Sequence, residues 1–173
     1  MTDQLPLFDA GNAFKMKINK PIAFFDLETT GVNISTDRII EICIVRVSPP
    51  NETVEVKTFR VNPGMPIPDQ SSSIHGIYDK DVADKPPFAD IALQVSQFMK
   101  DCDLGGFNSI RFDIPLLIEE FFRAGIEFDI SKRKLIDSQR IFHLMEPRTL
   151  GAAYRFYCNK DLENAHSAEA DTL

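Results

Sequence analysis

The sequence predicts an α/β fold in one domain, and three observations support this prediction. The first half of the chain carries short apolar runs separated by turn residues, a pattern typical of strands. The second half repeats apolar residues every three or four positions, a pattern typical of helices. The length of 173 residues suits a single domain with a sizeable core. Strands first, then alternating helices and strands, predict a mixed sheet flanked by helices.

Three strands joined by short loops are expected first. From Pro21 the chain reads Pro-Ile-Ala-Phe-Phe-Asp-Leu-Glu, which is apolar on both alternating faces and therefore favours a central strand. Residues 38–47 and 53–61 predict two further strands, separated by a turn at 48–51. We therefore expect a three-stranded antiparallel meander.

A helix is expected after a loop that carries Pro, Ser and Gly. Pro86 and Pro87 stand where this helix would begin. Its buried side is predicted to continue in three- and four-residue steps through Ile91, Val95, Phe98 and Cys102. A short strand at 104–107 should follow.

A second helix is predicted over 111–123, and Gly125 is expected to end it. Its buried side is predicted to carry Ile114, Leu117, Ile118, Phe121 and Phe122. A short strand at 134–137 and two helices at 138–145 and 149–158 complete the expected order. The strands after the meander are expected to be parallel.

The bulk composition predicts an ordinary soluble protein of the cytoplasm, with 43% hydrophobic and 26% charged residues. No apolar run reaches the length of a membrane span, and the N-terminal residues lack the layout of a signal peptide, so we expect no membrane association. The net charge of −7 argues only mildly against nucleic-acid binding. Divalent cations held by carboxylates would add positive charge that a formal count omits.

The three cysteines, Cys43, Cys102 and Cys158, are widely spaced and odd in number. This spacing argues against a metal knot and against a disulfide framework. We therefore predict that they are buried small hydrophobic residues.

Two acids stand at the end of the first predicted strand. Asp26 and Glu28 are two positions apart, so their side chains should point to the same face while Leu27 points away. Like charges at this spacing repel, and a divalent cation between them would remove the repulsion. Alternatively, the chain simply leaves the core here and both carboxylates are solvated. The pair alone does not decide between these interpretations.

Three further polar residues are weak signals when each is taken singly. Asp113 stands near the start of the second helix, where the helix dipole favours an acid. His166 and Asp171 would face one site only if the stretch between them is helical or leads into a helix. A solvated histidine on a polar segment is the ordinary alternative.

In order and at domain-scale spacing, these residues resemble a known family. The chain reads FDLETTG at 25–31 and GFNSIRFD at 106–113, and it ends with His166-x4-Asp171. These segments resemble the three exonuclease motifs of the DEDDh, or DnaQ-like, superfamily, and most of all the proofreading epsilon subunit of bacterial DNA polymerase III. Residues 39–42 and 73–77 are similar to the family's second strand and substrate loop. The resemblance runs from about Pro21 to the last residue and implies a ribonuclease H-like mixed sheet.

The resemblance implies two-metal chemistry. It makes Asp26, Glu28, Asp113 and Asp171 the ligands of two divalent ions and His166 the general base. All-carboxylate sites suit Mg²⁺ or Mn²⁺ rather than Zn²⁺. Two such ions activate a water molecule and stabilise the departing 3′ oxygen. A histidine of near-neutral pKa can accept the proton of the water.

The resemblance also implies contacts with the substrate. The backbone around Thr29 and Thr30 resembles the part of the family that meets the terminal 3′-OH. His75 resembles a substrate-loop histidine that contacts the terminal nucleotide, although a turn histidine without a ligand is the alternative. Asp137, which precedes a predicted helix, is expected to be its N-cap.

We expect residues 1–20 to form an N-terminal arm and residues 21–173 to form the exonuclease domain. In the family, the residue matching Asp171 begins a helix of several turns, whereas two residues follow it here. The domain is therefore expected to lack its C-terminal helix, and its metal occupancy is expected to be low. The distance from Asn108 to Asp113 exceeds the common family spacing, so the intervening loop should differ.

The leading prediction is a 3′→5′ exonuclease that releases nucleoside monophosphates from single-stranded DNA 3′ ends in replication proofreading or repair. An exoribonuclease acting on short RNA is the alternative enzyme, although the FDLETTG form favours the polymerase-associated branch. A catalytically inactive docking subunit is the alternative of another class. The complete set of four acids and one histidine argues against that alternative.

A short peptide near the N-terminus suggests protein partners. Gln4-Leu5-Pro6-Leu7-Phe8 resembles the QLxLF peptide by which bacterial replication and repair proteins bind the sliding clamp. Leu5, Leu7 and Phe8 would fill apolar pockets while Gln4 fixes the register. The alternative is that these residues pack on the domain itself or belong to a disordered start. A DNA polymerase and its sliding clamp are the predicted partners if the peptide acts in this way.

Overall fold

A computed structural model describes residues 18–50, 53–146 and 149–161. The predictions made for His166, for Asp171 and for the peptide at residues 4–8 lie outside the described residues. Within the described ranges, no helix is both long enough and apolar enough to cross a bilayer.

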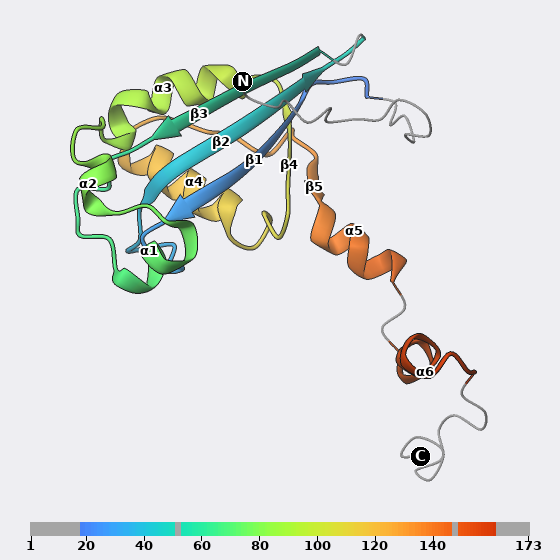
Figure 1. The fold of residues 1–173 in the computed structure, drawn as a ribbon. Coiled ribbons are helices and arrows are strands. Elements are labelled where there is room, and N and C mark those ends of the chain that lie inside the picture. The colour runs from blue at the N-terminus through green and yellow to red at the C-terminus, as the bar shows by residue number, and fades with distance from the viewer. Residues whose placement is uncertain (1–17, 51–52, 147–148, 162–173) are drawn as a thin grey trace, which may run out of the picture.

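Five strands form one mixed sheet in the order β3-β2-β1-β4-β5 (Figure 1). β1 (Ile22–Thr29), β2 (Ile39–Ser48) and β3 (Thr53–Arg60) form the predicted antiparallel meander. β4 (Asp103–Gly106) pairs in parallel with β1, and β5 (Leu135–Asp137) pairs in parallel with β4. The predicted fold class is confirmed, and β1 is the central strand.

Two helices cover one face of this sheet (Figure 1). Ala23, Phe25 and Leu27 of β1 alternate toward this face, since residues two apart on a strand share a face. They belong to one buried cluster with residues of α3 (Phe88–Phe98) and α4 (Asp113–Arg123). The core therefore lies between β1–β2 and these two helices.

The ends of these helices follow the local signals with small differences. Pro87 occupies the N-cap of α3 as predicted, and Gly125 follows α4 in the left-handed conformation with φ of 68°. α4 begins at Asp113 rather than at residue 111, because Phe112 has non-helical angles. The predicted burial of Phe122 is wrong, since this side chain is 77% exposed. It falls at the edge of the apolar stripe, where the sheet no longer covers the helix.

The segment between β3 and α3, predicted to be a loop, contains two short helices. These are α1 (Asp69–His75) and α2 (Asp79–Val82). Helices of one or two turns carry too few residues to show an apolar period, so the sequence pattern did not reveal them. A second buried cluster holds this segment against β2, and it consists of Ile40, Ile67, Ile77 and Val82.

α5 (Ser138–Met145) has the predicted bounds, and α6 (Leu150–Cys158) begins one residue later than predicted, with Thr149 as its N-cap. Both helices extend away from the sheet (Figure 1). Neither helix buries a residue. Their exposed apolar side chains are Ile141, Phe142, Leu144, Met145, Leu150, Phe156 and Tyr157. Cys158 is exposed as well, so its predicted burial is wrong, whereas Cys102 is buried and Cys43 is half-buried. A helix buries a cysteine only where it packs on another element, and α6 buries nothing.

Candidate active site

The end of β1 carries two of the predicted site acids. Asp26 lies opposite Cys43 and Glu28 lies opposite Glu41 in the β1–β2 register. Alternate residues share a face, so both carboxylates project to the face that α3 and α4 leave open. Asp26 is exposed and Glu28 is half-buried. The predicted common face of Asp26 and Glu28 is confirmed.

The parallel pairing of β4 with β1 brings Asp113 to the same end of the sheet. β4 ends at Gly106, and a short loop leads to Asp113, the first residue of α4. A Cβ atom at Gly106 would lie 2.9 Å from the carbonyl oxygen of Phe25. Glycine is therefore required for this close approach. Asp113 itself is only 5% exposed.

Asp26 acts electrostatically on both other acids. Burial and then the negative charge of Asp26 raise the pKa of Asp113 to about 6. The same two causes, in the same order, raise the pKa of Glu28. A bound cation would relieve the repulsion between these carboxylates. An all-oxygen donor set of this kind fits Mg²⁺ or Mn²⁺.

The structure brings Glu28 and Asp113 each into the electrostatic range of Asp26. In the part of the chain that is described, no group of three or more His, Cys, Asp or Glu side chains is arranged to hold a metal ion. The ligand roles of the acids therefore stay predictions. So does the general-base role of His166.

His75 lies beside the acids with one unused nitrogen. Helix α1 rests on the end of β1, because Ser71 Oγ donates a 2.7 Å hydrogen bond to the carbonyl oxygen of Thr30. Nδ1 of His75 accepts a 3.1 Å hydrogen bond from the backbone N–H of Ile77, so Nε2 carries the proton of the neutral ring. This Nε2 is buried and has no partner among the described residues. His75 lies close enough to Glu28 that a proton on its ring would oppose the rise that burial causes in the pKa of Glu28.

The hydroxyl and the backbone N–H of Thr30 are both used in hydrogen bonds to neighbouring residues. Thr30 is 1% exposed, and its hydroxyl donates to Asp37 Oδ1 at 3.0 Å and accepts from the N–H of Arg38 at 3.0 Å. Its own N–H donates to the carbonyl oxygen of Arg38. Thr29 is half-buried, and its hydroxyl donates to the carbonyl oxygen of Gly31 at 2.7 Å. The predicted contacts of Thr29 and Thr30 with substrate stay predictions.

Asp137 joins the loop before α4 to the start of α5. Its carboxylate accepts from the N–H groups of Gln139 and Arg140, which confirms the predicted N-cap. It also accepts from the N–H groups of Asn108 at 3.0 Å and Ile110 at 3.3 Å, a contact that the sequence did not indicate. Burial alone would raise the pKa of Asp137, but these four donors hold it below the usual value.

Replacing Asp137 with Ala should lower the free energy of unfolding by about 2 kcal/mol, because four backbone donors lose their acceptor. The catalytic rate should also fall, since the freed loop leads directly to Asp113. Urea unfolding and turnover measure the two effects. Asp129→Ala is the control, because Asp129 accepts from Ser131 in an exposed turn. Equal losses in both variants would contradict this role of Asp137.

Replacing Asp113 with Asn should stabilise the metal-free protein at about pH 8 by about 1–3 kcal/mol. The folded-state pKa of about 6 lies above the usual 3.8. The stability that Asp113 contributes is therefore present below about pH 4 and lost as the pH rises through about 6. Asn stays neutral, so the advantage of the variant should vanish near pH 4. Urea unfolding in EDTA at the two pH values measures this difference, and a variant less stable than the wild type at pH 8 would disprove it.

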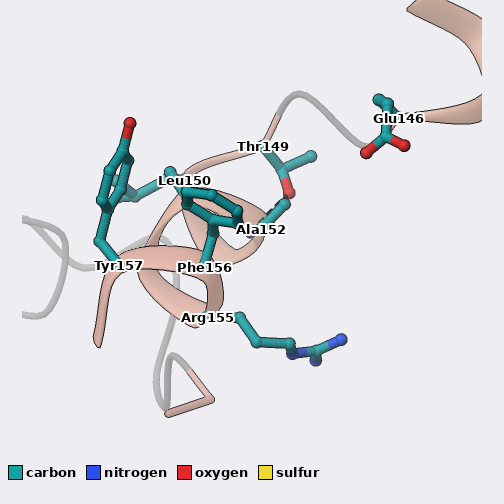
Figure 2. Close-up of a pocket in the computed structure, with 8 residues that line it drawn as sticks. Glu146, Thr149, Leu150, Ala152, Arg155, Phe156 and Tyr157 are labelled. Carbon is teal, nitrogen blue, oxygen red and sulfur yellow. Dashed lines mark hydrogen bonds between the residues drawn. The ribbon is translucent and has the colours of Figure 1, made fainter. Parts of the chain in front are cut away.

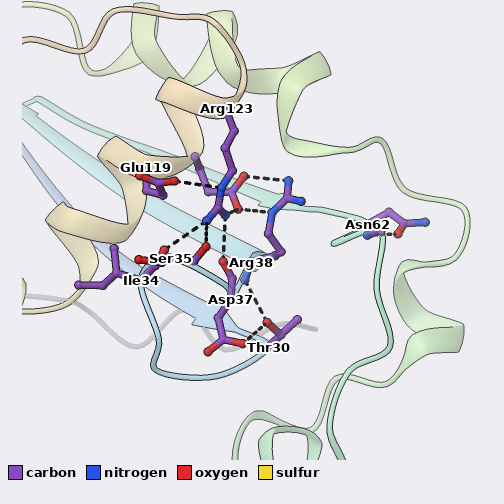
Figure 3. Close-up of polar contacts among 10 residues, drawn as sticks. Thr30, Ile34, Ser35, Asp37, Arg38, Asn62, Glu119 and Arg123 are labelled. Carbon is purple, nitrogen blue, oxygen red and sulfur yellow. Dashed lines mark hydrogen bonds and ion pairs between the residues drawn. The ribbon is translucent and has the colours of Figure 1, made fainter.

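A buried ion network that the sequence did not reveal ties α4 to the loop after β1 (Figure 3). Glu120 is 1% exposed and accepts from Arg38 Nε at 2.6 Å and from Arg123 Nη1 at 3.1 Å. Arg123 also donates to three backbone carbonyl oxygens within residues 34–37. The spacing of Glu120 and Arg123 indicates a helical pair, but Arg38 stands 82 residues away.

A hollow beside α6 is separate from these acids. It is lined by Glu146, Thr149, Leu150, Ala152, Ala153, Arg155, Phe156 and Tyr157 (Figure 2). Figure 1 places α6 far from the end of β1, where Asp26 and Glu28 lie. The candidate site is therefore the end of β1 and not this hollow.

A five-stranded mixed sheet in this order, with helices on its face, is a ribonuclease H-like fold. The sequence model of a family described as "Exonuclease" matches residues 23–173. The chain is 31% identical to the DNA polymerase III subunit epsilon of Buchnera aphidicola subsp. Acyrthosiphon pisum, over 88% of this chain and 68% of that protein. The chain therefore belongs to the exonuclease family of DnaQ-like 3′→5′ exonucleases, in which dependence on divalent metal is general.

Two further similarities agree with this assignment. The chain is 31% identical to a DNA polymerase III subunit epsilon-like protein of Rhodobacter capsulatus over 86% of its own length, and it spans 22% of that protein. E. coli exonuclease I in complex with a dT13 oligonucleotide has a similar fold, with a TM-score of 0.63. That match has 20% identity and covers 87% of this chain and 38% of the other. It supports the fold alone.

Proposed function

We propose that this chain hydrolyses terminal phosphodiester bonds at the 3′ ends of DNA and releases nucleoside monophosphates, in replication proofreading or repair. The observation that carries the proposal is that three acids lie close together at the end of the central strand. The negative charge of Asp26 there adds to burial in raising the pKa of both Glu28 and Asp113. These carboxylates lie at the end of β1 and the start of α4, and they repel one another. A bound cation would balance their negative charges. In the active site of a nuclease, such cations activate the attacking water and stabilise the oxygen that leaves the phosphate.

Each site residue has a role in this proposal. Asp26, Glu28, Asp113 and Asp171 would hold two Mg²⁺ or Mn²⁺ ions. Bound there, the ions would activate a water molecule and stabilise the departing 3′ oxygen. His166 accepts the proton of the attacking water at its imidazole ring. The part of the chain that matches the family model includes both His166 and Asp171.

The substrate contacts follow from the end of β1 and from α1. The backbone at Thr29 and Thr30 would meet the terminal 3′-OH. His75 would donate from Nε2 to an acceptor of the terminal nucleotide, because this buried nitrogen has no partner among the described residues. The cytoplasmic location expected from the sequence belongs to the same proposal.

DNA is the proposed substrate because one relative is named DNA polymerase III subunit epsilon and another DNA polymerase III subunit epsilon-like protein. The structurally similar exonuclease I was solved with a dT13 oligonucleotide. The same relatives support a proposed association with a DNA polymerase. Binding of the sliding clamp through Gln4, Leu5, Leu7 and Phe8 stays a prediction from the sequence.

The test uses 5′-labelled single-stranded DNA and RNA oligonucleotides of one sequence. In Mg²⁺ or Mn²⁺ the DNA should shorten from its 3′ end in single-nucleotide steps, faster than the RNA, and EDTA should abolish the reaction. Full activity in EDTA would disprove the metal site. Faster shortening of RNA would identify an exoribonuclease. No shortening of either polymer would favour the inactive docking subunit.

A further inference from the structure

Strand β3 lies at one edge of the sheet that the described strands form. It pairs with β2 and with no other described strand. All of its residues are exposed except Phe59, which is half-buried. Val54 and Val56 are 45% and 60% exposed. A regular strand with unpaired backbone groups on one side is a template for another strand.

The charges on β3 could be read as protection against such pairing, because charged side chains commonly blunt sheet edges. Their positions indicate otherwise. Glu55 and Lys57 are two residues apart and share one face, the face where Lys57 Nζ lies 4.5 Å from the ring centre of Phe98 in α3. Val56, between them, points to the opposite face. Glu55 is paired only loosely within the chain, at 3.9 Å from Arg46, with half of its side chain exposed.

Antiparallel pairing of β3 with β3 of a second copy can keep the faces aligned in only a few registers. When the pairing is centred on Val56, Glu55 of each copy lies opposite Lys57 of the other. When it is centred on Glu55, the two Glu55 side chains face each other, and when it is centred on Lys57, the two Lys57 side chains do. Opposite charges directly across a strand pair stabilise it and like charges destabilise it. The charges therefore select the register centred on Val56.

The open face of the sheet supports the same register. Val56 of β3 lies opposite Val45 of β2, which lies opposite Phe24 of β1. The row continues through Gly105 and Ile136 of β4 and β5. Pairing centred on Val56 places the two Val56 side chains next to each other and joins two such apolar rows into one.

We propose that this chain forms a symmetric dimer in which the β3 strands pair antiparallel about Val56. The two five-stranded sheets then become one continuous sheet. β2 separates β3 from β1, so both candidate active sites stay open to substrate. The contact area of one strand pair predicts a weak dimer, with a dissociation constant on the order of micromolar.

Charge reversal with complementation tests the register. Lys57→Glu and Glu55→Lys each place like charges opposite each other twice in a self-paired dimer, and each should weaken dimerisation by about tenfold or more. An equimolar mixture of the two variants restores both attractive pairs, so the mixture should form a heterodimer. Sedimentation velocity of the full chain, over a wide concentration range, measures all four samples. The nuclease rate of each variant should match that of the wild type. Each variant should stay folded and lose no more than about 1 kcal/mol of stability, since Lys57→Glu removes the contact with Phe98 and Glu55→Lys removes the loose pair with Arg46.

Disulfide trapping provides an independent measurement. In a Cys158→Ser background, Val56→Cys places two thiols across the symmetry axis and should cross-link under mild oxidation. Val54→Cys, which would lie opposite Thr58, is the matched control and should not cross-link. A wild-type chain that stays monomeric at the highest concentrations would overturn the proposal. So would dimers insensitive to charge reversal, a variant mixture that does not associate, or equal cross-linking at positions 54 and 56.

Discussion

Replacing Asp26 with Asn should slow the removal of 3′ nucleotides by at least about 10³-fold and leave the fold intact. Asp26 lies close to both of the other acids, since its charge adds to burial in raising the pKa of Glu28 and of Asp113. Asn keeps the size of the side chain but removes the negative charge that a divalent cation requires. The rate on 5′-labelled single-stranded DNA at saturating Mg²⁺ measures the loss.

Asp129→Asn is the matched control for this prediction, because Asp129 lies in an exposed turn with Ser131 as its partner. It should retain the wild-type rate. In EDTA near pH 8 the Asp26→Asn protein should unfold at a higher temperature than the wild type, because it lacks the repulsion of Asp113 and Glu28. A rate above about a tenth of the wild-type value would remove Asp26 from the set of metal ligands.

Replacing Glu120 with Ala should lower the free energy of unfolding by about 3–5 kcal/mol. Glu120 is the shared partner of Arg38 and Arg123, and it is almost fully buried. Its removal takes from the half-buried Arg38 its acidic partner and leaves Arg123 with the more exposed Glu119. It therefore weakens the attachment of α4 to the loop after β1. Such a loss is a large part of the total stability of a typical domain. Urea unfolding of the metal-free protein measures it.

Glu119→Ala is the control for the Glu120 variant. Glu119 is the preceding residue, and its side chain is 36% exposed. Its one ion pair among the described residues is with Arg123, at 3.3 Å. An exposed pair of this kind contributes less than about 1 kcal/mol. If both variants lost the same stability, the buried network would not be what holds α4 to the loop.

The order and type of the main elements could be predicted because the signals are local. Short apolar runs bounded by turn residues located β1, β2 and β3, and the apolar period of three or four residues located α3 and α4. Both patterns depend only on residues a few positions apart. The N-cap at Asp137 is equally local, since it binds N–H groups two and three residues along the chain.

The sequence predictions were wrong where contacts between distant segments determine the structure. α1 and α2 are too short to show a period and depend on a cluster with Ile40. Phe122 was assigned to the buried stripe of α4, but the side of the helix on which it lies faces solvent. Glu120 is buried although it is charged. An apolar pattern does not predict this, because the burial of a charge depends on the partners that it finds in the folded chain.

The sequence by itself determined that Asp26 and Glu28 share one face, because a strand turns alternate residues to the same side. It also determined that Asp113 stands in the first turn of a helix. Only the tertiary structure decided that Asp113 comes close to Asp26, that His75 lies near Glu28, and that Arg38 meets Glu120. The physical reason is that these contacts join segments far apart in the chain. Strand pairing and helix packing over the whole domain fix their distances, and no local pattern encodes them.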